Sequence, residues 1–334
     1  MRHRIFNWAG TAILAASALA VSLPTLAQER SGWPTSVKIG TASQGGTYFI
    51  YGAGWGNLVK EMLGVNATAE VTGGPTQNMV LVNAGDLQFG MTTMGPAHAG
   101  WTGQIEMAPG VEMKNVRAMF PMYKTPFQVV ALQRSGIKSI ADLNGKRVGV
   151  GPRGGTASVY WPKFFQDLGI KATLQYGGAS DQTGQVQDGL IDAFAFAAGV
   201  PISAFRQIEA QHPVNIFSFN EKELATVLEK NPSVSRFDIP AGTYSSVEGV
   251  QTTVAMWNFA IANKDMPASL VYEIMKTVLD NNDRMMQIHK SSSETLAANM
   301  VNNSFMWFHP GAIRYFKEKG IEVPKHLIPP EYKE

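Results

Sequence analysis

The chain has 334 residues, with 28 basic and 26 acidic side chains, six histidines and no cysteine. This length favours about two domains with a large core, and the lack of cysteine excludes disulfides, thiolate nucleophiles and cysteine-ligated metals. The near-neutral charge predicts neither nucleic acid nor a membrane surface as a partner, and the scattered histidines lack metal-ligand spacing, so we expect no metal and no cofactor.

The N-terminus is predicted to be a secretory signal peptide over residues 1–27. Two arginines precede an apolar run over residues 9–23, and residues 25–27 (Thr-Leu-Ala) fit a small-residue cleavage site. The alternative is an uncleaved membrane anchor, but Pro24 interrupts the run and a spanning helix needs about 20 apolar residues. We therefore expect export to the periplasm, with cleavage leaving 26 basic and 26 acidic residues.

Beyond this segment, short apolar runs alternate with amphipathic stretches, which is the pattern of α/β architecture. In a first series, helix-like segments follow the first two of the strands expected at residues 36–40, 67–73 and 87–93. A long strand, or a pair of strands, is expected at residues 117–133.

A second series resembles the first in its alternation. Its strands are expected at residues 147–151, 172–177, 191–199 and 214–219. Another long strand is expected at residues 252–263, before helical patterns over residues 266–283, 292–302 and 309–319.

Two α/β series joined by two long strands predict two lobes with a cleft between them. Lobe 1 is expected to comprise residues 28–128 and 252–334, and lobe 2 residues 129–251. The crossing strands are expected to form a hinge near residues 127–130 and 252–255.

In each series, one glycine-rich loop follows the first strand. The sequence GTASQGGT spans residues 40–47, and GPRGGT spans residues 151–156. After a parallel strand, such a turn lets the backbone approach a ligand, while the next helix presents unpaired N–H groups and the positive end of its dipole. The alternative is that the glycines only make tight turns. Because the design occurs once in each lobe, we favour one anionic ligand held between the lobes.

Better-known glycine motifs do not fit these loops. Gly46 stands where a P-loop has lysine, and the second loop is too short for that motif. GVGPRG at residues 149–154 matches a dinucleotide fingerprint, but Gly149 lies within an expected strand and no acid follows about 20 residues on. A Gly-x-Ser-x-Gly nucleophile elbow is absent from the sequence.

Polar residues near the loops are the candidate ligand contacts. They are Ser43, Gln44, Thr47 and Tyr48, then Thr76, Gln77 and Asn78, and finally Arg153, Thr156 and Ser158. The planar guanidinium of Arg153 suits a carboxylate, although an exposed loop arginine is the alternative. Tyr48 and Phe194 are candidates to cover an aliphatic ligand body, unless they belong to the core. Asp192 is expected to brace its own lobe, and His309 to start a helix.

Six segments together resemble the extracytoplasmic solute receptors of the TAXI branch of TRAP transporters. They occur in this order over nearly the whole mature chain: IGTASQGGTYF, TGGPTQNMVLVNAGDLQFGM, VGVGPRGGTAS, QDGLIDAFAFAAGVP, IPAGTYSSVEGVQTTV and HPGAIRYFKEKG. The resemblance implies an α/β, two-lobed type II periplasmic-binding-protein fold with a ligand cleft between the lobes.

The resemblance also implies a function without catalysis. Such a receptor captures a small organic anion, commonly an amino acid or a di- or tricarboxylate, and delivers it to the membrane permease subunits of a TRAP transporter. Carried onto this chain, the implied ligand contacts are Gly45, Gly46, Thr47 and Tyr48, then Gly74, Thr76 and Asn78, and finally Arg153, Gly154, Gly155 and Thr156. The family's third loop is similar to Gly-Ser-Gly-Thr, so the arginine here leaves the ligand class open. We expect a monomer.

Three alternatives to a transport receptor remain at this stage. A ligand-sensing periplasmic protein of a signalling system would bind its ligand in the same way. An enzyme on the same fold would need a nucleophile or an acid/base pair in the cleft, and the loops offer neither. A surface antigen without a small ligand would leave the paired polar loops without a purpose.

Overall fold

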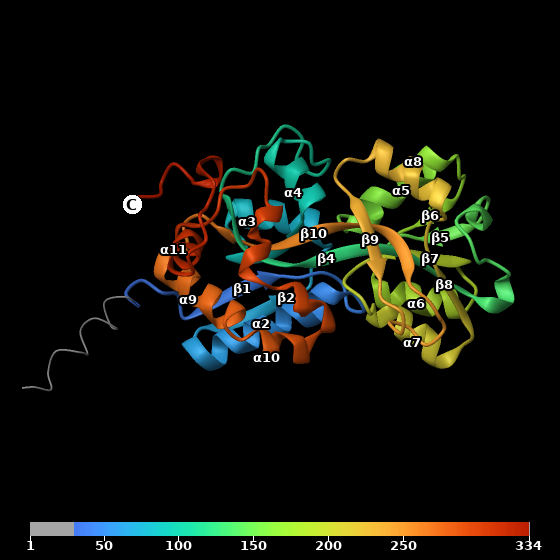
Figure 1. Cartoon of the computed structure of the whole chain (residues 1–334), viewed down its shortest axis with the longest axis horizontal. Helices are drawn as coiled ribbons and strands as arrows, with labels where there is room; N and C mark the ends of the chain where they lie inside the picture. Colours follow the sequence, from blue (N-terminus) through green and yellow to red (C-terminus); the bar gives the residue numbers. More distant parts are fainter. Residues whose placement is uncertain (1–29, 334) are drawn as a thin grey trace, which may run out of the picture. The chain divides into compact units, whose positions relative to one another are not determined.

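The computed structural model describes residues 30–333, and the chain from Pro34 onward forms one compact unit (Figure 1). The described residues 30–33 belong to a separate unit. The predicted signal peptide over residues 1–27 lies outside the described residues. Within the described range, none of the helices combines the length and apolar character needed to cross a membrane.

The described chain alternates strands and helices, which confirms the α/β class. The strands are β1 (Ser36–Gly40), β2 (Asn66–Glu70), β3 (Phe89–Thr93), β4 (Val116–Leu132), β5 (Arg147–Gly149), β6 (Thr173–Gln175), β7 (Ala193–Ala197), β8 (Val214–Phe217), β9 (Ser235–Ile239) and β10 (Gln251–Asn263). The helices are α2 (Thr47–Leu63), α3 (Pro75–Ala84), α4 (Met94–Trp101), α5 (Thr156–Leu168), α6 (Ala179–Gln187), α7 (Ser203–Gln211), α8 (Glu221–Lys230), α9 (Ala268–Leu279), α10 (Asn282–Ile288) and α11 (Pro310–Glu318).

Lobe 1 is built on β1, β2 and β3. These strands are parallel in the order β2-β1-β3, and β10 joins β3 in antiparallel orientation. Val37 and Ile39 of β1 point into the core, while the alternate positions Ser36 and Lys38 are exposed. Helices α3 and α4 pack together on one side, and α2 packs with α9 and α10 on the other (Figure 1).

Lobe 2 is built on β5, β6 and β7 with α5 to α8. Strand β5 lies parallel to both β6 and β7, and β7 pairs with β4 in antiparallel orientation. An aromatic cluster fills the core, where the ring centroids of Phe127 and Phe164 lie 5.0 Å apart and those of Trp161 and Phe164 lie 5.8 Å apart. The second α/β series therefore has its own hydrophobic core.

Strands β4 and β10 run through both lobes. Their pairing ends with Ala255 opposite Pro126. Past this pair, β4 continues from Phe127 against β7 and β8, while β10 pairs with β9. This change of partners lies beside the stretches expected to form the hinge. The predicted lobe boundaries, 28–128 and 252–334 for lobe 1 and 129–251 for lobe 2, remain a prediction.

Several elements differ from the sequence-based expectation, and β9 and α8 were not expected at all. Residues 266–283 form α9 and α10 with a break between them, and residues 292–302 lie mostly in two short 3-10 helices, η3 (Lys290–Glu294) and η4 (Ala297–Asn302). Polar side chains compete with helical hydrogen bonds there, because the Asn282 amide donates to the carbonyls of Ser292 and Thr295. Helix α4 was not expected, because its sequence MGPAHAGW has no clear apolar period.

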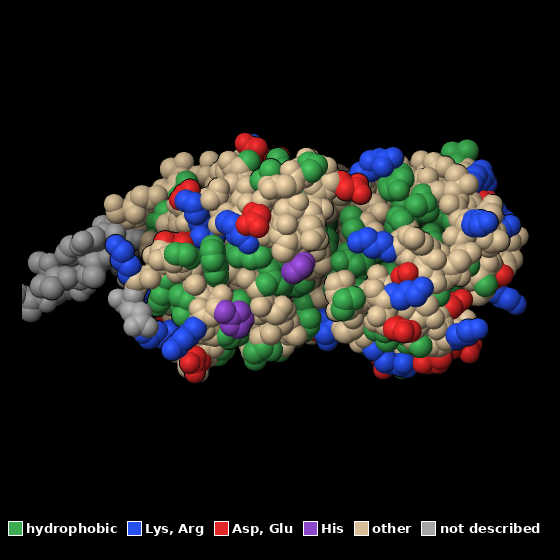
Figure 2. Space-filling view, turned by 90° about the horizontal axis from the view of Figure 1, so that it is seen from above, with side chains coloured by type: hydrophobic (Ala, Val, Ile, Leu, Met, Phe, Trp, Pro, Cys, Tyr) green, Lys and Arg blue, Asp and Glu red, His purple; other side chains and the backbone are tan. Residues whose placement is uncertain are grey.

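The surface seen in Figure 2 carries basic and acidic side chains in an interspersed arrangement. This distribution agrees with the near-neutral composition of the chain. On this face, therefore, no single sign of charge dominates the approach of a partner.

Candidate ligand-binding site

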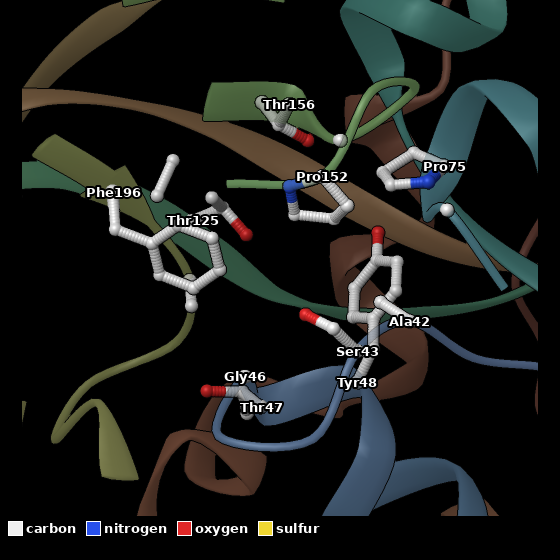
Figure 3. Close-up of a pocket in the computed structure, with 14 residues that line it drawn as sticks. Ala42, Ser43, Gly46, Thr47, Tyr48, Pro75, Thr125, Pro152, Thr156 and Phe196 are labelled. Carbon is white, nitrogen blue, oxygen red and sulfur yellow. The ribbon is translucent and has the colours of Figure 1, made fainter. Parts of the chain in front are cut away.

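A cavity of about 40 Å³ lies where loops of both lobes meet (Figure 3). It is lined by Ala42, Ser43, Gly46, Thr47, Tyr48, Gly73, Pro75, Thr125, Pro152, Gly155, Thr156, Phe196, Ala197 and Ala198. Apart from Thr125 of β4, these residues lie at or beyond the carboxyl ends of the parallel strands β1, β2, β5 and β7, or in the helices that follow. In open α/β sheets, ligands bind at this end of the strands.

The two Gly-Gly-Thr loops adopt the same backbone conformation. The first glycine has φ of +87° at Gly45 and +89° at Gly154, values that favour glycine. The second glycine, Gly46 or Gly155, has φ and ψ of −92° and 159° or −77° and 156°. Each second glycine donates its N–H to the carbonyl three residues earlier, as in a turn with glycine at its third position. The repeated sequence therefore encodes one turn, used once in each lobe.

These turns end in helices whose N-termini are left without side-chain caps. Neither Gly46 before α2 nor Gly155 before α5 provides a capping side chain, and neither helix has an acid in its first turn. By contrast, α8 has a complete capping box between Asn220 and Glu223. The first N–H groups of a helix lack intrahelical acceptors and carry the positive end of its dipole. Both helix ends therefore offer unneutralised donors at the cavity.

Asn258 organises the floor of the cavity, although the sequence analysis missed it. Its amide donates to the Tyr123 carbonyl and, at 2.8 Å, to Thr125 Oγ1, while its own carbonyl oxygen accepts from Tyr48 Oη at 2.6 Å. Burial raises the pKa of Tyr48 well above its usual value, so its phenol stays neutral. An asparagine within an apolar strand was the available signal, because a buried amide must find partners.

Direct hydrogen bonds join the lobes around the cavity. They run from Thr47 Oγ1 to the Gly199 carbonyl at 2.6 Å, from Thr76 N to the Gly154 carbonyl at 3.0 Å, from Ala179 N to Ser43 Oγ at 3.1 Å, and from Ala204 N to the Gly45 carbonyl at 3.1 Å. The hydroxyls of Thr93 and Thr156 also pair at 2.8 Å. The glycine loops of each lobe thus contact the other lobe, which is the arrangement of a closed cleft.

The structure brings six of the predicted contacts to the cavity. These are Ser43, Gly46, Thr47, Tyr48, Gly155 and Thr156. The other candidates do not line it: Gln44, Gly45, Gly74, Thr76, Gln77, Asn78, Arg153, Gly154, Ser158 and Phe194. Direct ligand contact remains a prediction for all sixteen, and the lining adds residues that the sequence did not single out, above all Phe196 and Thr125.

Local geometry explains why several candidates lie away from the cavity. Gln44 and Arg153 occupy the second position of their turns and are exposed, and the Arg153 guanidinium lies over the Tyr176 ring at 4.0 Å. The buried Asn78 amide donates to the carbonyls of Gly40, Thr41 and Met91, so it holds the first loop in place. Arg153 and Asn78 therefore have structural partners.

Phe194 is fully buried one step behind the cavity wall. It packs against Phe196 with ring centroids 4.8 Å apart and against Phe205 at 5.7 Å. Phe196 lies two residues closer to the carboxyl end of β7, and its ring faces the cavity (Figure 3). Phe196 therefore lines the cavity, whereas Phe194 lies behind it, and ligand contact by Phe194 remains a prediction.

Two polar residues away from the cavity have the structural roles that the sequence indicates. His309 caps α11, because its Nδ1 accepts from Gly311 N at 3.2 Å. Asp192 braces lobe 2 through a 2.7 Å bond from the Arg147 guanidinium, which lowers the pKa of its carboxyl group.

The charged side chains of the described residues do not line the cavity. None of the fourteen lining residues is a lysine, arginine, histidine, aspartate or glutamate. A larger hollow of about 840 Å³ has charged walls, including Lys124, Arg206, Glu209, Asp238 and Glu294, but none of its lining residues comes from the glycine loops. Among the described residues, no cluster of three or more histidine and acidic side chains has the geometry to hold a metal ion.

Residues 39–320 match the sequence model of the NMT1-like family. The fold is similar to that of an ABC uptake transporter substrate-binding protein from Streptococcus pneumoniae with bound histidine, at 14% identity and a TM-score of 0.50, covering 83% of this chain and 99% of that one. This likeness shows a two-lobed type II periplasmic-binding-protein fold, which confirms the predicted architecture.

Two further solved structures are similar at lower scores. One is PhnD1 from Prochlorococcus marinus in complex with methylphosphonate, at 13% identity and a TM-score of 0.49, covering 79% of this chain and 92% of that one. The other is the GluR0 ligand-binding core from Nostoc punctiforme in complex with L-glutamate, at 13% identity and a TM-score of 0.45, covering 76% and 97%.

Proposed function

The chain belongs to the NMT1-like family, and we propose that it is a periplasmic solute receptor that captures a small organic anion between its lobes and delivers it to a membrane permease. One observation carries this proposal: the first turns of α2 and α5, one from each lobe, meet at one cavity. Their free N–H groups and dipoles suit an anion without any basic side chain.

Capture proceeds by closure of the lobes. In the open form, the loops at residues 40–47 and 151–156 are separated and wet. An anion that reaches both helix ends favours the closed form, because only there does it meet both sets of donors. The hinge lies in β4 and β10 near Pro126 and Ala255, where each strand changes its partner. Closure then creates the surface that a permease recognises.

The export step and the permease class are parts of the proposal. A signal peptide over residues 1–27 would direct the protein to the periplasm, and resemblance to TAXI receptors favours a TRAP permease driven by an ion gradient. The Streptococcus pneumoniae protein is described with an ABC transporter instead. Uptake into vesicles separates the two: a TRAP permease needs an ion gradient and no ATP, whereas an ABC permease needs ATP. Gradient-independent, ATP-driven uptake would overturn the TRAP assignment.

Binding is tested by thermal unfolding of the purified protein against a panel of amino acids, mono-, di- and tricarboxylates. A ligand at 100 times its dissociation constant adds about 2.7 kcal/mol of stability. Thr156→Val removes a cavity hydroxyl at constant shape, whereas Thr226→Val makes the same change on α8. We expect weaker stabilisation by the ligand only in the first variant. If no organic anion stabilises the protein, the receptor function is wrong.

A further inference from the structure

The cavity combines the N-termini of α2, α3 and α5 with walls that carry no charged side chain. Its polar side chains are the hydroxyls of Ser43, Thr47, Tyr48, Thr125 and Thr156, and the rest of its lining is glycine, alanine, proline and Phe196. The charge that the ligand brings must therefore be balanced by the backbone. This condition limits how many charges, and of which sign, the ligand can have.

Two helix ends balance about one negative charge. Each N-terminus is equivalent to roughly half a positive elementary charge, so α2 and α5 together match a single carboxylate. The third end, that of α3, adds little, because Pro75 has no N–H and Thr76 N already donates to the Gly154 carbonyl. A second carboxylate in the cavity would have no cation beside it among the lining residues. Burial of an unpaired ion is strongly unfavourable, so the site discriminates against di- and tricarboxylates.

An α-ammonium group on the ligand is also disfavoured, because its positive charge would have no negative partner in the cavity. None of the lining residues is an aspartate or glutamate. The positive helix ends would repel an ammonium group that approached them. Tyr48 stays neutral because burial raises its pKa, so it provides no anion either. The site thus lacks a counter-charge for a zwitterionic amino acid.

The hydroxyls leave protons for a carboxylate. Ser43 Oγ accepts from Ala179 N at 3.1 Å, so its own proton is available to a ligand oxygen. In the pair between Thr93 and Thr156 either hydroxyl can donate, and the Thr156 proton is available to the ligand when Thr93 donates. Tyr48 and Thr47 donate to protein acceptors, so they position the walls.

The size of the cavity limits the ligand body. The cavity of about 40 Å³ exceeds the minimum of about 10 Å³ that one water needs, but it leaves room for only a small ligand body in the closed cleft. Phe196 approaches from one side and Tyr48 from the other in Figure 3. The Phe196 ring is supported by Phe194, itself packed against Phe205, so this wall cannot retreat without disturbing the core of lobe 2.

We propose that the ligand is a short-chain monocarboxylate of about two to four carbons, with neither an ammonium group nor a second carboxylate. This inference rests on the proposed function and narrows its ligand class. The single carboxylate binds between the N-termini of α2 and α5, and the alkyl chain packs between Tyr48 and Phe196.

Two matched pairs of compounds test the charge rule by calorimetry on the purified protein. Propionate and L-alanine differ by the ammonium group, and butyrate and succinate differ by the second carboxylate. We expect the monocarboxylate of each pair to bind at least 100-fold more tightly. Equal or tighter binding of alanine or succinate overturns the inference and leaves the receptor function standing. If none of the four binds and no other organic anion does, the receptor function fails as well.

The size rule is tested with Phe196→Ala. Removing the ring lengthens the cavity, so we expect the preference to move at least tenfold from butyrate towards hexanoate. Phe164→Ala is the matched control, because it removes a buried ring of the same lobe that does not line the cavity and packs instead against Phe127 and Trp161. Phe196→Leu gives a smaller shift in the same direction if the alanine variant does not fold. An unchanged chain-length preference in a folded Phe196 variant overturns the proposed position of the alkyl chain.

Discussion

Asn258→Leu is expected to destabilise the ligand-free protein because it removes the acceptor of a buried phenol. The leucine leaves Tyr48 Oη without its acceptor and the Tyr123 carbonyl without this donor. A buried polar group without a partner costs about 1–3 kcal/mol, so we expect a loss of about 3 kcal/mol. Tyr48→Phe alone is milder, about 1 kcal/mol, because the Asn258 carbonyl still accepts from Thr125.

The double variant distinguishes this bond from a general loss of packing. Tyr48→Phe in the Asn258→Leu background removes the very hydroxyl that the leucine strands. The two free energies of unfolding should therefore be non-additive by about 1–2 kcal/mol, with the double variant more stable than the sum predicts. Urea unfolding at neutral pH measures all four proteins, provided that their m-values agree.

Tyr51→Phe is the matched control for this cycle. Tyr51 lies in the same aromatic group, with its ring 5.2 Å from that of Tyr123, but its hydroxyl pairs with Thr295. Its coupling to Asn258→Leu should stay below about 0.5 kcal/mol. If the Tyr48 coupling is equally small, the Tyr48–Asn258 bond does not organise the cavity floor and the reasoning is refuted.

Three further predictions concern the cleft and the C-terminal helix. Gly74→Ala should destabilise the closed form more than Gly64→Ala, as measured by thermal unfolding. Both glycines have positive φ, but only a Cβ added at Gly74 would meet the other lobe, 3.2 Å from the Cα of Gly155. Equal losses of stability in the two variants would contradict this interlobe contact. Burial lowers the pKa of His309 to about 4, whereas in the unfolded chain this histidine protonates near pH 6.5. The free energy of unfolding should therefore fall by up to about 3 kcal/mol as the pH drops from 6.5 to 4. His309→Asn should largely abolish this pH dependence, as measured by urea unfolding. Arg153→Ala should change ligand affinity less than about threefold in calorimetry, because the exposed side chain does not line the cavity; a tenfold loss would return it to the ligand site.

The local chemistry of the loops was readable from the sequence. Two Gly-Gly-Thr segments after short apolar runs predicted turns, helix starts and backbone donors, because a positive φ and an uncapped first turn are properties of a few adjacent residues. The strand positions followed from the same local patterns, except for β9, which was not predicted. At His309, the order His-Pro-Gly correctly predicted a helix start.

The orientation of side chains was not readable in the same way. Phe194 and Phe196 have identical neighbours in the sequence AFAFA, and only the end of β7 that meets the other lobe decides which ring reaches the cavity. The guanidinium of Arg153 suits the binding of a ligand carboxylate, but its place at the second position of a tight turn leaves the side chain exposed. Asn258 acquires its role from Tyr48, 210 residues away in the chain.

A receptor for a small ligand needs direct contacts between its lobes, because a small ligand provides little free energy to close them. An ion of five heavy atoms gains at most about 1.5 kcal/mol per atom, whereas moving a receptor from 1% to 99% closed takes about 5.5 kcal/mol of differential binding. Little would then remain for affinity. Hydrogen bonds between the lobes, such as those from Thr76 N to Gly154 and from Ala204 N to Gly45, stabilise the closed form without the ligand. For the proposed receptor, these bonds would reduce the shift that a small ligand in a cavity of about 40 Å³ must drive.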